Sequence, residues 1–209
     1  MTITRLHAFL IGILAVLLAG TQMPSCAVDT APPPPAPFDA SPWLDRIELG
    51  ATTDQAAEIL SAYLQIDTTN PPGNETSGAL FLASLLQAEG IPAQVIESAP
   101  GRGNLVARLR GATDAPALCL LSHIDVATAD GATFPPERGP FSGARADGAV
   151  WGRGALDMKG MGVVQLLTVL ALHRADVPLE RDVVLVATAD EESAGSGARY
   201  LAEHHWHEL

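Results

Sequence analysis

The chain has 209 residues, 47% of them hydrophobic and 17% charged, which describes a globular protein with one sizeable core rather than a disordered chain. Only 12 Lys and Arg stand against 24 Asp and Glu, giving a formal net charge of −12. Because phosphate binding needs a basic surface, we expect no nucleic-acid partner.

The N-terminal segment has the pattern of a secretory signal peptide. The apolar run at 9–19 is too short to span a bilayer but suits the hydrophobic region of such a peptide, and small residues precede a cleavage point after Ala27. We therefore predict a signal peptide at 1–27 and export to the periplasm or the medium, with no membrane span left after cleavage. Two alternatives stay open. One is lipid attachment at Cys26, whose preceding residues lack the Leu and the small residue of a lipoprotein cleavage box, and the other is an uncleaved N-terminal anchor.

A proline-rich stretch follows the signal peptide. The sequence "APPPPAPFDASPW" (31–43) has little to bury and predicts an extended polyproline II linker, which we place at 28–42. The folded domain is then expected at 43–209, and no internal repeat is evident within it.

Hydrophobic periodicity predicts helices and strands along the rest of the chain. Three segments have helical spacing, the first after a Thr cap, and four have the pattern of strands: helices at 52–66, 76–90 and 158–176, and strands at 93–98, 104–111, 117–126 and 182–190. The last two strands are near-continuous apolar runs, which are typical of strands covered on both faces. The expected fold class is α/β, with a mixed, largely parallel central sheet flanked by helices.

The cysteines provide no disulfide framework. With Cys26 in the leader, Cys119 is the only thiol left in the folded domain. It lies inside the apolar strand "ALCLLS", so we expect it to be a buried, small hydrophobic side chain.

Polar side chains gather just past the carboxyl ends of the predicted strands, where open α/β sheets carry their chemistry. His123 and Asp125 follow "ALCLLS", Asp157 lies in the loop "GRGALDMKG", and the acidic residues 190–192 follow "VVLVATA". Taken singly, these are ordinary features: a surface histidine, a helix N-cap and a solvated turn. Together, an imidazole and carboxylates from separate elements, spaced by 34 residues, are the ligand set of zinc or related metals in hydrolytic sites. A cation would also offset the repulsion among three adjacent carboxylates.

The motifs "SHIDV", "WGRGALDMKG" and "TADEES", in that order and at that spacing, resemble the M20 metallopeptidase family, which includes carboxypeptidases, aminoacylases, acetylornithine deacetylases and succinyl-diaminopimelate desuccinylases. The resemblance runs from about Thr52 to the last residue and includes "IDTTNPPGNE" and "GRGNLVARLRG". It implies a zinc-exopeptidase-like catalytic domain that hydrolyses amide bonds of small peptides or N-acyl amino acids. A nucleotide-binding doubly wound domain is disfavoured, because neither Gly-rich stretch has the full dinucleotide fingerprint.

The resemblance implies a site for two zinc ions, with cobalt as an alternative metal. His123 would bind one zinc, and Asp125 would orient the imidazole through its other ring nitrogen. Asp157 would bridge both metals, and the peptide bond after this aspartate is usually cis in the family. Glu192 would bind a zinc, and Glu191 would stay free of metal to act as the general base.

Three further features receive no catalytic role. Asp190 is expected to form hydrogen bonds within its turn, and "NPPGNE" is expected to be a turn between two helices. His204, His205 and His207 are expected to lie at the end of an amphipathic helix rather than in a metal site.

The chain departs from the family pattern in its length, because members normally continue with a further acidic ligand, a smaller lid domain and a late histidine ligand. We therefore expect the N-terminal part of an M20 catalytic domain, with an exposed sheet edge, which is inactive as this chain alone. The alternative is a complete chain with a degenerate site that acts as a non-catalytic metal-binding or interaction module. A homodimer is expected only if the lid domain is present.

Overall fold

A computed structural model describes residues 49–209, with side chains from Thr52 onward. The predicted signal peptide (1–27), the linker (28–42) and the first residues of the domain lie outside the described residues. The helices are α3 (Leu49–Leu64), α4 (Glu75–Ala88), α5 (Gly160–Arg174) and α6 (Ser196–His204). The strands are β1 (Ala93–Glu97), β2 (Gly103–Leu109), β3 (Leu118–His123), β4 (Ala144–Ala146), β5 (Ala149–Trp151) and β6 (Val183–Thr188).

The central sheet has the strand order β1-β2-β6-β3. It is mixed, as expected, but the expectation of a largely parallel sheet is wrong for the described strands. β3 pairs with β6 in parallel, whereas β1–β2 and β2–β6 are antiparallel. The short turn between β1 and β2 permits only an antiparallel pair, while the long connection through α5 permits the parallel pairing of β3 and β6.

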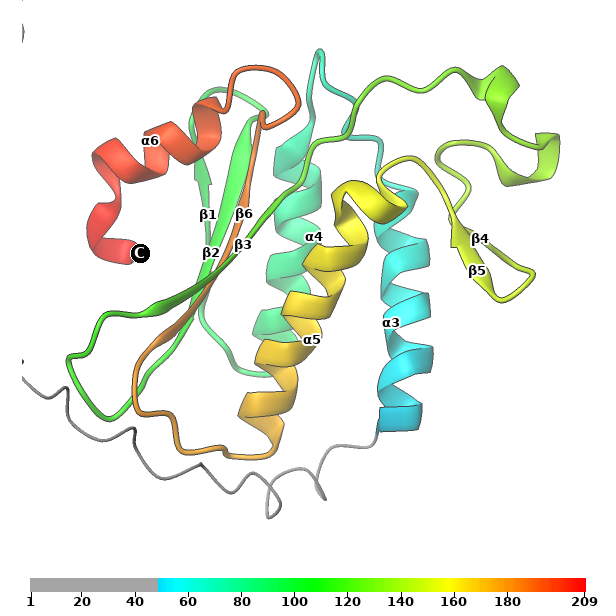
Figure 1. Ribbon diagram of the computed structural model, residues 1–209. Helices are drawn as coiled ribbons and strands as arrows, with labels where there is room; N and C mark the ends of the chain where they lie inside the picture. Colours follow the sequence, from blue (N-terminus) through cyan, green and yellow to red (C-terminus); the bar gives the residue numbers. More distant parts are fainter. Residues whose placement is uncertain (1–48) are drawn as a thin grey trace, which may run out of the picture. The chain divides into compact units, whose positions relative to one another are not determined.

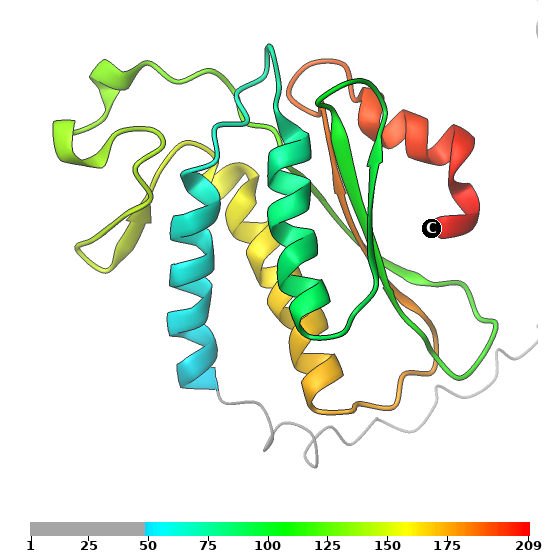
Figure 2. The ribbon, with the colours of Figure 1, turned by 180° about the vertical axis from the view of Figure 1, so that it is seen from behind.

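Helices cover both faces of this sheet. α4 packs on β1 and β2, α5 packs on β3 and β6, and α3 packs against α5 on the same side. α6 lies on the opposite side of the sheet (Figures 1 and 2), where Leu201 joins an apolar cluster with Val106, Val184 and Val186. All six residues of β6 are buried because helices cover this strand from both sides.

Helix α5 and the segment before it are apolar and long enough, by composition, to span a membrane. In the fold, the apolar residues of this helix pack in the core. Leu166, Leu167 and Leu170 are buried in the main core together with residues of the sheet and of α4. The helix is therefore one side of a packed core between helices and sheet.

The expectation that β3 is covered on both faces is wrong. Leu118 and Leu121 are each 53% exposed, and Cys119 is exposed rather than buried. β3 pairs only with β6 among the described strands, and α6 covers β2 and β6 instead of β3. The predicted exposed sheet edge is thus present at β3. The apolar sequence of β3 does not show which of its two faces is covered by a helix.

Two local features differ from the sequence prediction. Helix α3 begins at Leu49, so the threonine expected to cap it lies within its first turn. The β4–β5 hairpin is absent from the prediction, although its turn is the dipeptide Asp147-Gly148, in which both residues have positive φ, 53° and 73°. Asp-Gly between short strands is the usual signal for a two-residue hairpin, and the sequence contains this signal.

Candidate metal centre

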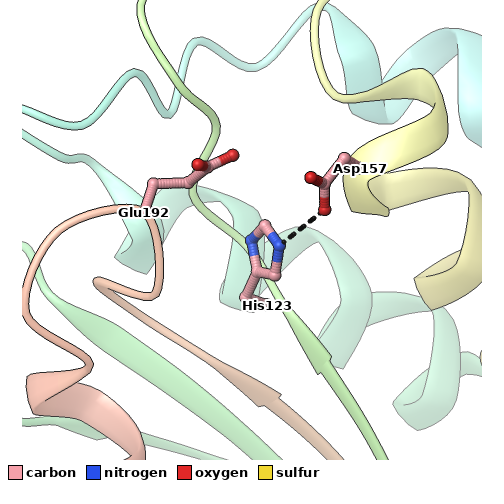
Figure 3. A group of neighbouring side chains, drawn as sticks. All are labelled: His123, Asp157 and Glu192. Atoms are coloured by element: carbon pink, nitrogen blue, oxygen red, sulfur yellow. Dashed lines mark hydrogen bonds and ion pairs between the residues drawn. The ribbon is translucent and has the colours of Figure 1, made fainter.

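The carboxyl ends of β3 and β6 carry the predicted site. β3 ends at His123, and β6 ends at Thr188, four residues before Glu192. Because the two strands are parallel neighbours, both ends open at the same edge of the sheet. Asp157 reaches the same place from the kinked turn Ala155–Lys159 that precedes α5. Figure 3 shows the three side chains converging from these three elements.

His123, Asp157 and Glu192 form a compact group. Each offers one ligand atom, and these atoms all lie within 4.8 Å of one another. Nε2 of His123 is 3.1 Å from Oδ1 of Asp157, and Oε1 of Glu192 accepts a hydrogen bond of 3.2 Å from the Ala127 amide. The imidazole is buried, whereas the Asp157 side chain is 81% exposed, so the group has a buried floor and an open mouth. It is the one group of this kind among residues 49–209.

The turn that carries Asp157 has the predicted special backbone. The Asp157–Met158 peptide bond is cis, as the resemblance implied. Two residues on, the buried ammonium of Lys159 donates hydrogen bonds to the carbonyl oxygens of Tyr63 (3.1 Å) and Ile66 (2.7 Å). Those carbonyls lie at the C-terminal end of α3, where a cation is favoured. Lys159 therefore ties the turn to α3.

Asp125 lies beside the second ring nitrogen of His123 and also contacts the turn that carries the glutamates. Nδ1 of His123 lies 2.9 Å from the backbone oxygen of Asp125, and 3.5 Å from its carboxylate. Both the backbone oxygen and the carboxylate of Asp125 therefore lie close to Nδ1 of the imidazole. The fully buried carboxylate also accepts hydrogen bonds from the amides of Glu191 (3.0 Å) and Glu192 (2.9 Å) and from the side chain of Asn70 (2.8 Å). Asp125 consequently fixes the backbone of both glutamates.

The electrostatics favour a cation in the group. Burial lowers the pKa of His123, but hydrogen bonds to Asp125 and Asp157 outweigh burial and raise that pKa to about 9. Burial raises the pKa of Asp125, but hydrogen bonds from His123, Asn70 and the backbone lower it to about 2. The chemistry of the donor set therefore fits a divalent metal, which would take the place of the imidazole proton.

Glu191 lies at the edge of the same group. Its Oε2 is 3.8 Å from Nε2 of His123, and its side chain is 60% exposed. Glu191 is thus near the ligands, outside the group of three, and accessible to a substrate.

Asp190 makes the predicted turn contacts and also further ones. Its carboxylate accepts hydrogen bonds from the amide (3.2 Å) and hydroxyl (2.6 Å) of Ser196, which confirms its expected part in the turn. It also contacts Asn70 and Arg102, two residues to which the sequence assigns no role. The predicted turn at "NPPGNE" is confirmed, since it connects α3 to α4. His204 ends α6, as expected, and its ring contacts that of Tyr200 at a tilt of 55°.

A cavity of about 670 Å³ adjoins the group. Its wall is mostly apolar and includes Phe134, Trp151 and Leu156, while Asp157 and Glu192 stand among its lining residues. A volume of this order suits a small-molecule ligand.

The fold places two carboxylates and one imidazole in a group that could hold a metal, and comparisons with known proteins give the family. Residues 119–208 match the model of peptidase family M20/M25/M40. A probable succinyl-diaminopimelate desuccinylase of Staphylococcus epidermidis is 31% identical over 148 residues, 69% of this chain and 35% of that protein. The succinyl-diaminopimelate desuccinylase of Methylorubrum extorquens is 40% identical over 142 residues, 64% of this chain and 35% of that protein.

Two solved peptidase structures share the fold. Human carnosine dipeptidase 1 superposes with a TM-score of 0.65 at 21% identity, over 81% of this chain and 38% of that one. An M20 family metallo-carboxypeptidase of Sulfolobus solfataricus gives 0.58 at 23% identity, over 66% and 31%. The chain belongs to the M20 peptidase family. It spans about 35% of the length of the curated relatives it matches.

Proposed function

We propose that this chain carries the metal-binding and proton-transfer residues of a hydrolase that cleaves amide bonds in small peptides or N-acyl amino acids. The observation that carries the proposal is the group of His123, Asp157 and Glu192, whose ligand atoms lie within 4.8 Å of one another at the carboxyl edge of the sheet. The adjoining apolar cavity supports a small substrate placed beside this group.

The three residues would hold two zinc ions, or cobalt, with Asp157 as the shared ligand. Its exposed carboxylate has two oxygens available for that purpose, while the buried His123 and the backbone-anchored Glu192 would each serve one ion. When bound, such metals polarise the scissile carbonyl and lower the pKa of water towards about 7.

Glu191 would transfer the proton. Its carboxylate stands 3.8 Å from the imidazole, reaches solvent, and its backbone is fixed by Asp125. In this position it can take a proton from the attacking water and give it to the departing amine. A Bacillus subtilis protein of similar fold is described as a dinuclear metal-binding peptidase of the M20 family, which supports a two-metal arrangement here.

Two substitutions test these roles separately. In a longer form of the protein that includes a lid domain and hydrolyses amides, Glu191→Gln should keep the metal and slow hydrolysis by roughly 10²- to 10⁴-fold, because one positioned acid–base group is lost. Asp157→Ala should lose metal, measured by elemental analysis of dialysed protein. Hydrolysis at the parent rate by Glu191→Gln would show that another group moves the proton.

We further propose that the 209-residue chain by itself binds metal without hydrolysing substrate. The group offers three side chains for two metals, and its mouth is open to water at Asp157 and Glu191. Water that enters an open site weakens the electrostatic interactions that stabilise the transition state. Hydrolysis of dipeptides or N-acyl amino acids by the purified chain would contradict this. A non-catalytic metal-binding module is the second candidate, and it makes the same prediction for the isolated chain.

We propose that the protein is exported, because its N-terminal sequence has the pattern of a secretory signal peptide. A mass spectrum of the mature protein should give an N-terminus at Val28, directly after the predicted cleavage point. An intact Met1, or a lipid on Cys26, would support one of the alternatives.

A further inference from the structure

Asn70 joins two buried carboxylates beneath the metal group. It is 5% exposed and lies in the turn between α3 and α4, distant in sequence from both partners. Its Nδ2 atom donates to Oδ2 of Asp125 (2.8 Å) and to Oδ1 of Asp190 (2.9 Å). An amide nitrogen has two hydrogens, so one side chain satisfies both carboxylates at once.

Arg102 fixes which way this amide faces. Its Nη1 and Nη2 atoms donate to Oδ1 of Asn70, at 3.3 and 3.2 Å, so the oxygen of the amide must face the guanidinium. The Nδ2 side then has to face the two carboxylates. Arg102 is held in turn by the carbonyl oxygen of Pro72 (2.6 Å) and by an ion pair with Asp190. It also lies 3.4 Å from the fully buried Glu75 carboxylate.

The hydrogen bonds continue from Asn70 to the site itself. The carboxylate that receives the amide hydrogen, Asp125, holds the backbone amides of Glu191 and Glu192. Its own backbone oxygen holds Nδ1 of His123. Arg102, Asn70 and Asp125 therefore form a continuous set of contacts that ends at the predicted base and at two predicted metal ligands.

We propose that Asn70 is a positioning residue of the metal site, with Arg102 setting the orientation of its amide. This gives a role to the "TTNPPG" and "GRGN" stretches, which supply no ligand in the proposed function. The proposal rests on the proposed metal site. Asn70 acts through Asp125. The buried carboxylate of Asp125 keeps the turn at 191–192 in place, and it stays charged there only while donors such as Asn70 form hydrogen bonds to it.

The sharpest test is Asn70→Asp, which changes neither size nor shape. It replaces the shared donor with a third carboxylate facing Asp125 and Asp190, so the contact becomes repulsive. We expect the dissociation constant of the full chain for Zn²⁺ to rise about 10- to 100-fold, the range for loss of a partner that orients metal ligands. Asn74→Asp is the matched control. It lies in the same turn, but is exposed and donates only to the backbone of Asp67.

Zinc affinity is measured by competition with a chelating dye, and the visible absorption of the Co²⁺ form reports ligand geometry. Thermal unfolding without metal provides the stability of each variant. Asn70→Asp should change both the affinity and the Co²⁺ spectrum, whereas Asn74→Asp should change neither. A role confined to stability would lower the melting temperature and leave the affinity and the spectrum of the folded protein as in the parent.

A second variant, Asn70→Ser, covers the case in which Asn70→Asp does not fold. A hydroxyl donates one hydrogen, so one of the two carboxylates loses its donor, and we expect about 10-fold weaker zinc binding. Parent affinity and parent Co²⁺ spectrum in a folded Asn70 variant would overturn the inference while leaving the proposed function intact. A parent chain that binds no zinc would instead refute the metal site on which both depend.

Discussion

Removing the charge of Asp125 should destabilise the fold at neutral pH and much less in acid. The pKa of this carboxyl falls from 3.8 to about 2 in the folded state, since its hydrogen bonds outweigh the effect of burial. A lowered pKa means that the carboxylate form stabilises the fold above about pH 4 and that this contribution is lost as the pH falls towards 2. The difference corresponds to about 2 kcal/mol at pH 7. An asparagine in its place would also turn its amide group towards at least one of the donors at 191 and 192.

Urea unfolding of Asp125→Asn and parent, followed by circular dichroism in EDTA, tests this reasoning. The variant should lose at least about 2 kcal/mol at pH 7, and the gap should be about 1 kcal/mol smaller at pH 3, because only the contribution of the charge depends on pH. Asp114→Asn, at an exposed loop position, is the control and should match the parent at both pH values. A gap of the same size at pH 3 and pH 7 would mean that the loss comes from packing rather than from the buried charge. No gap at all would refute the account of this carboxylate.

Three further predictions follow from particular contacts. Gly197→Ala should destabilise the fold by about 1 to 3 kcal/mol in the same unfolding assay, because the added Cβ would collide with Oδ1 of Asn104 and the backbone of Ala189. Unchanged stability would show that α6 can shift. Zinc binding should strengthen as the pH rises from 6 to 8 and should release a proton, because the pKa of His123 is about 9 without metal. Calorimetry in buffers of different ionisation enthalpy measures the proton released. An affinity that does not depend on pH would contradict a protonated imidazole. The exposed Cys119 should react with a thiol reagent in the folded state, in a variant lacking the other cysteine. The reaction should be faster at higher pH because the thiolate is the nucleophile and partial burial raises the pKa of this thiol. A need for denaturant would show the thiol to be covered.

Much of the fold could be predicted because it is encoded locally. The helices and the central strands follow from hydrophobic periodicity, and the ends of β3 and β6 follow from the change to polar residues at His123 and Asp190. The site could be predicted for the same reason, since parallel neighbouring strands bring their carboxyl ends together.

The remaining features depend on partners distant in the sequence. Asn70 contacts residues 55 and 120 positions away, so no local pattern marks it as part of the site. The exposure of Cys119 depends on which strands α6 covers, and its apolar neighbours in β3 wrongly indicate burial. The resemblance implies that Asp125 orients the imidazole, but its hydrogen bonds from the backbone of the turn at 191–192 depend on how the three-dimensional fold places that turn.

The central claim is that His123, Asp157 and Glu192 hold a divalent metal, and X-ray absorption of the zinc-loaded chain tests it most directly. The control variant carries Asn in place of His204, His205 and His207, which removes adventitious binding at the end of α6. We predict nitrogen and oxygen ligands at about 2.0 to 2.2 Å with imidazole scattering that survives in this control and disappears in His123→Ala. Zinc that stays bound in His123→Ala, or that leaves when the three C-terminal histidines are replaced, would contradict the account.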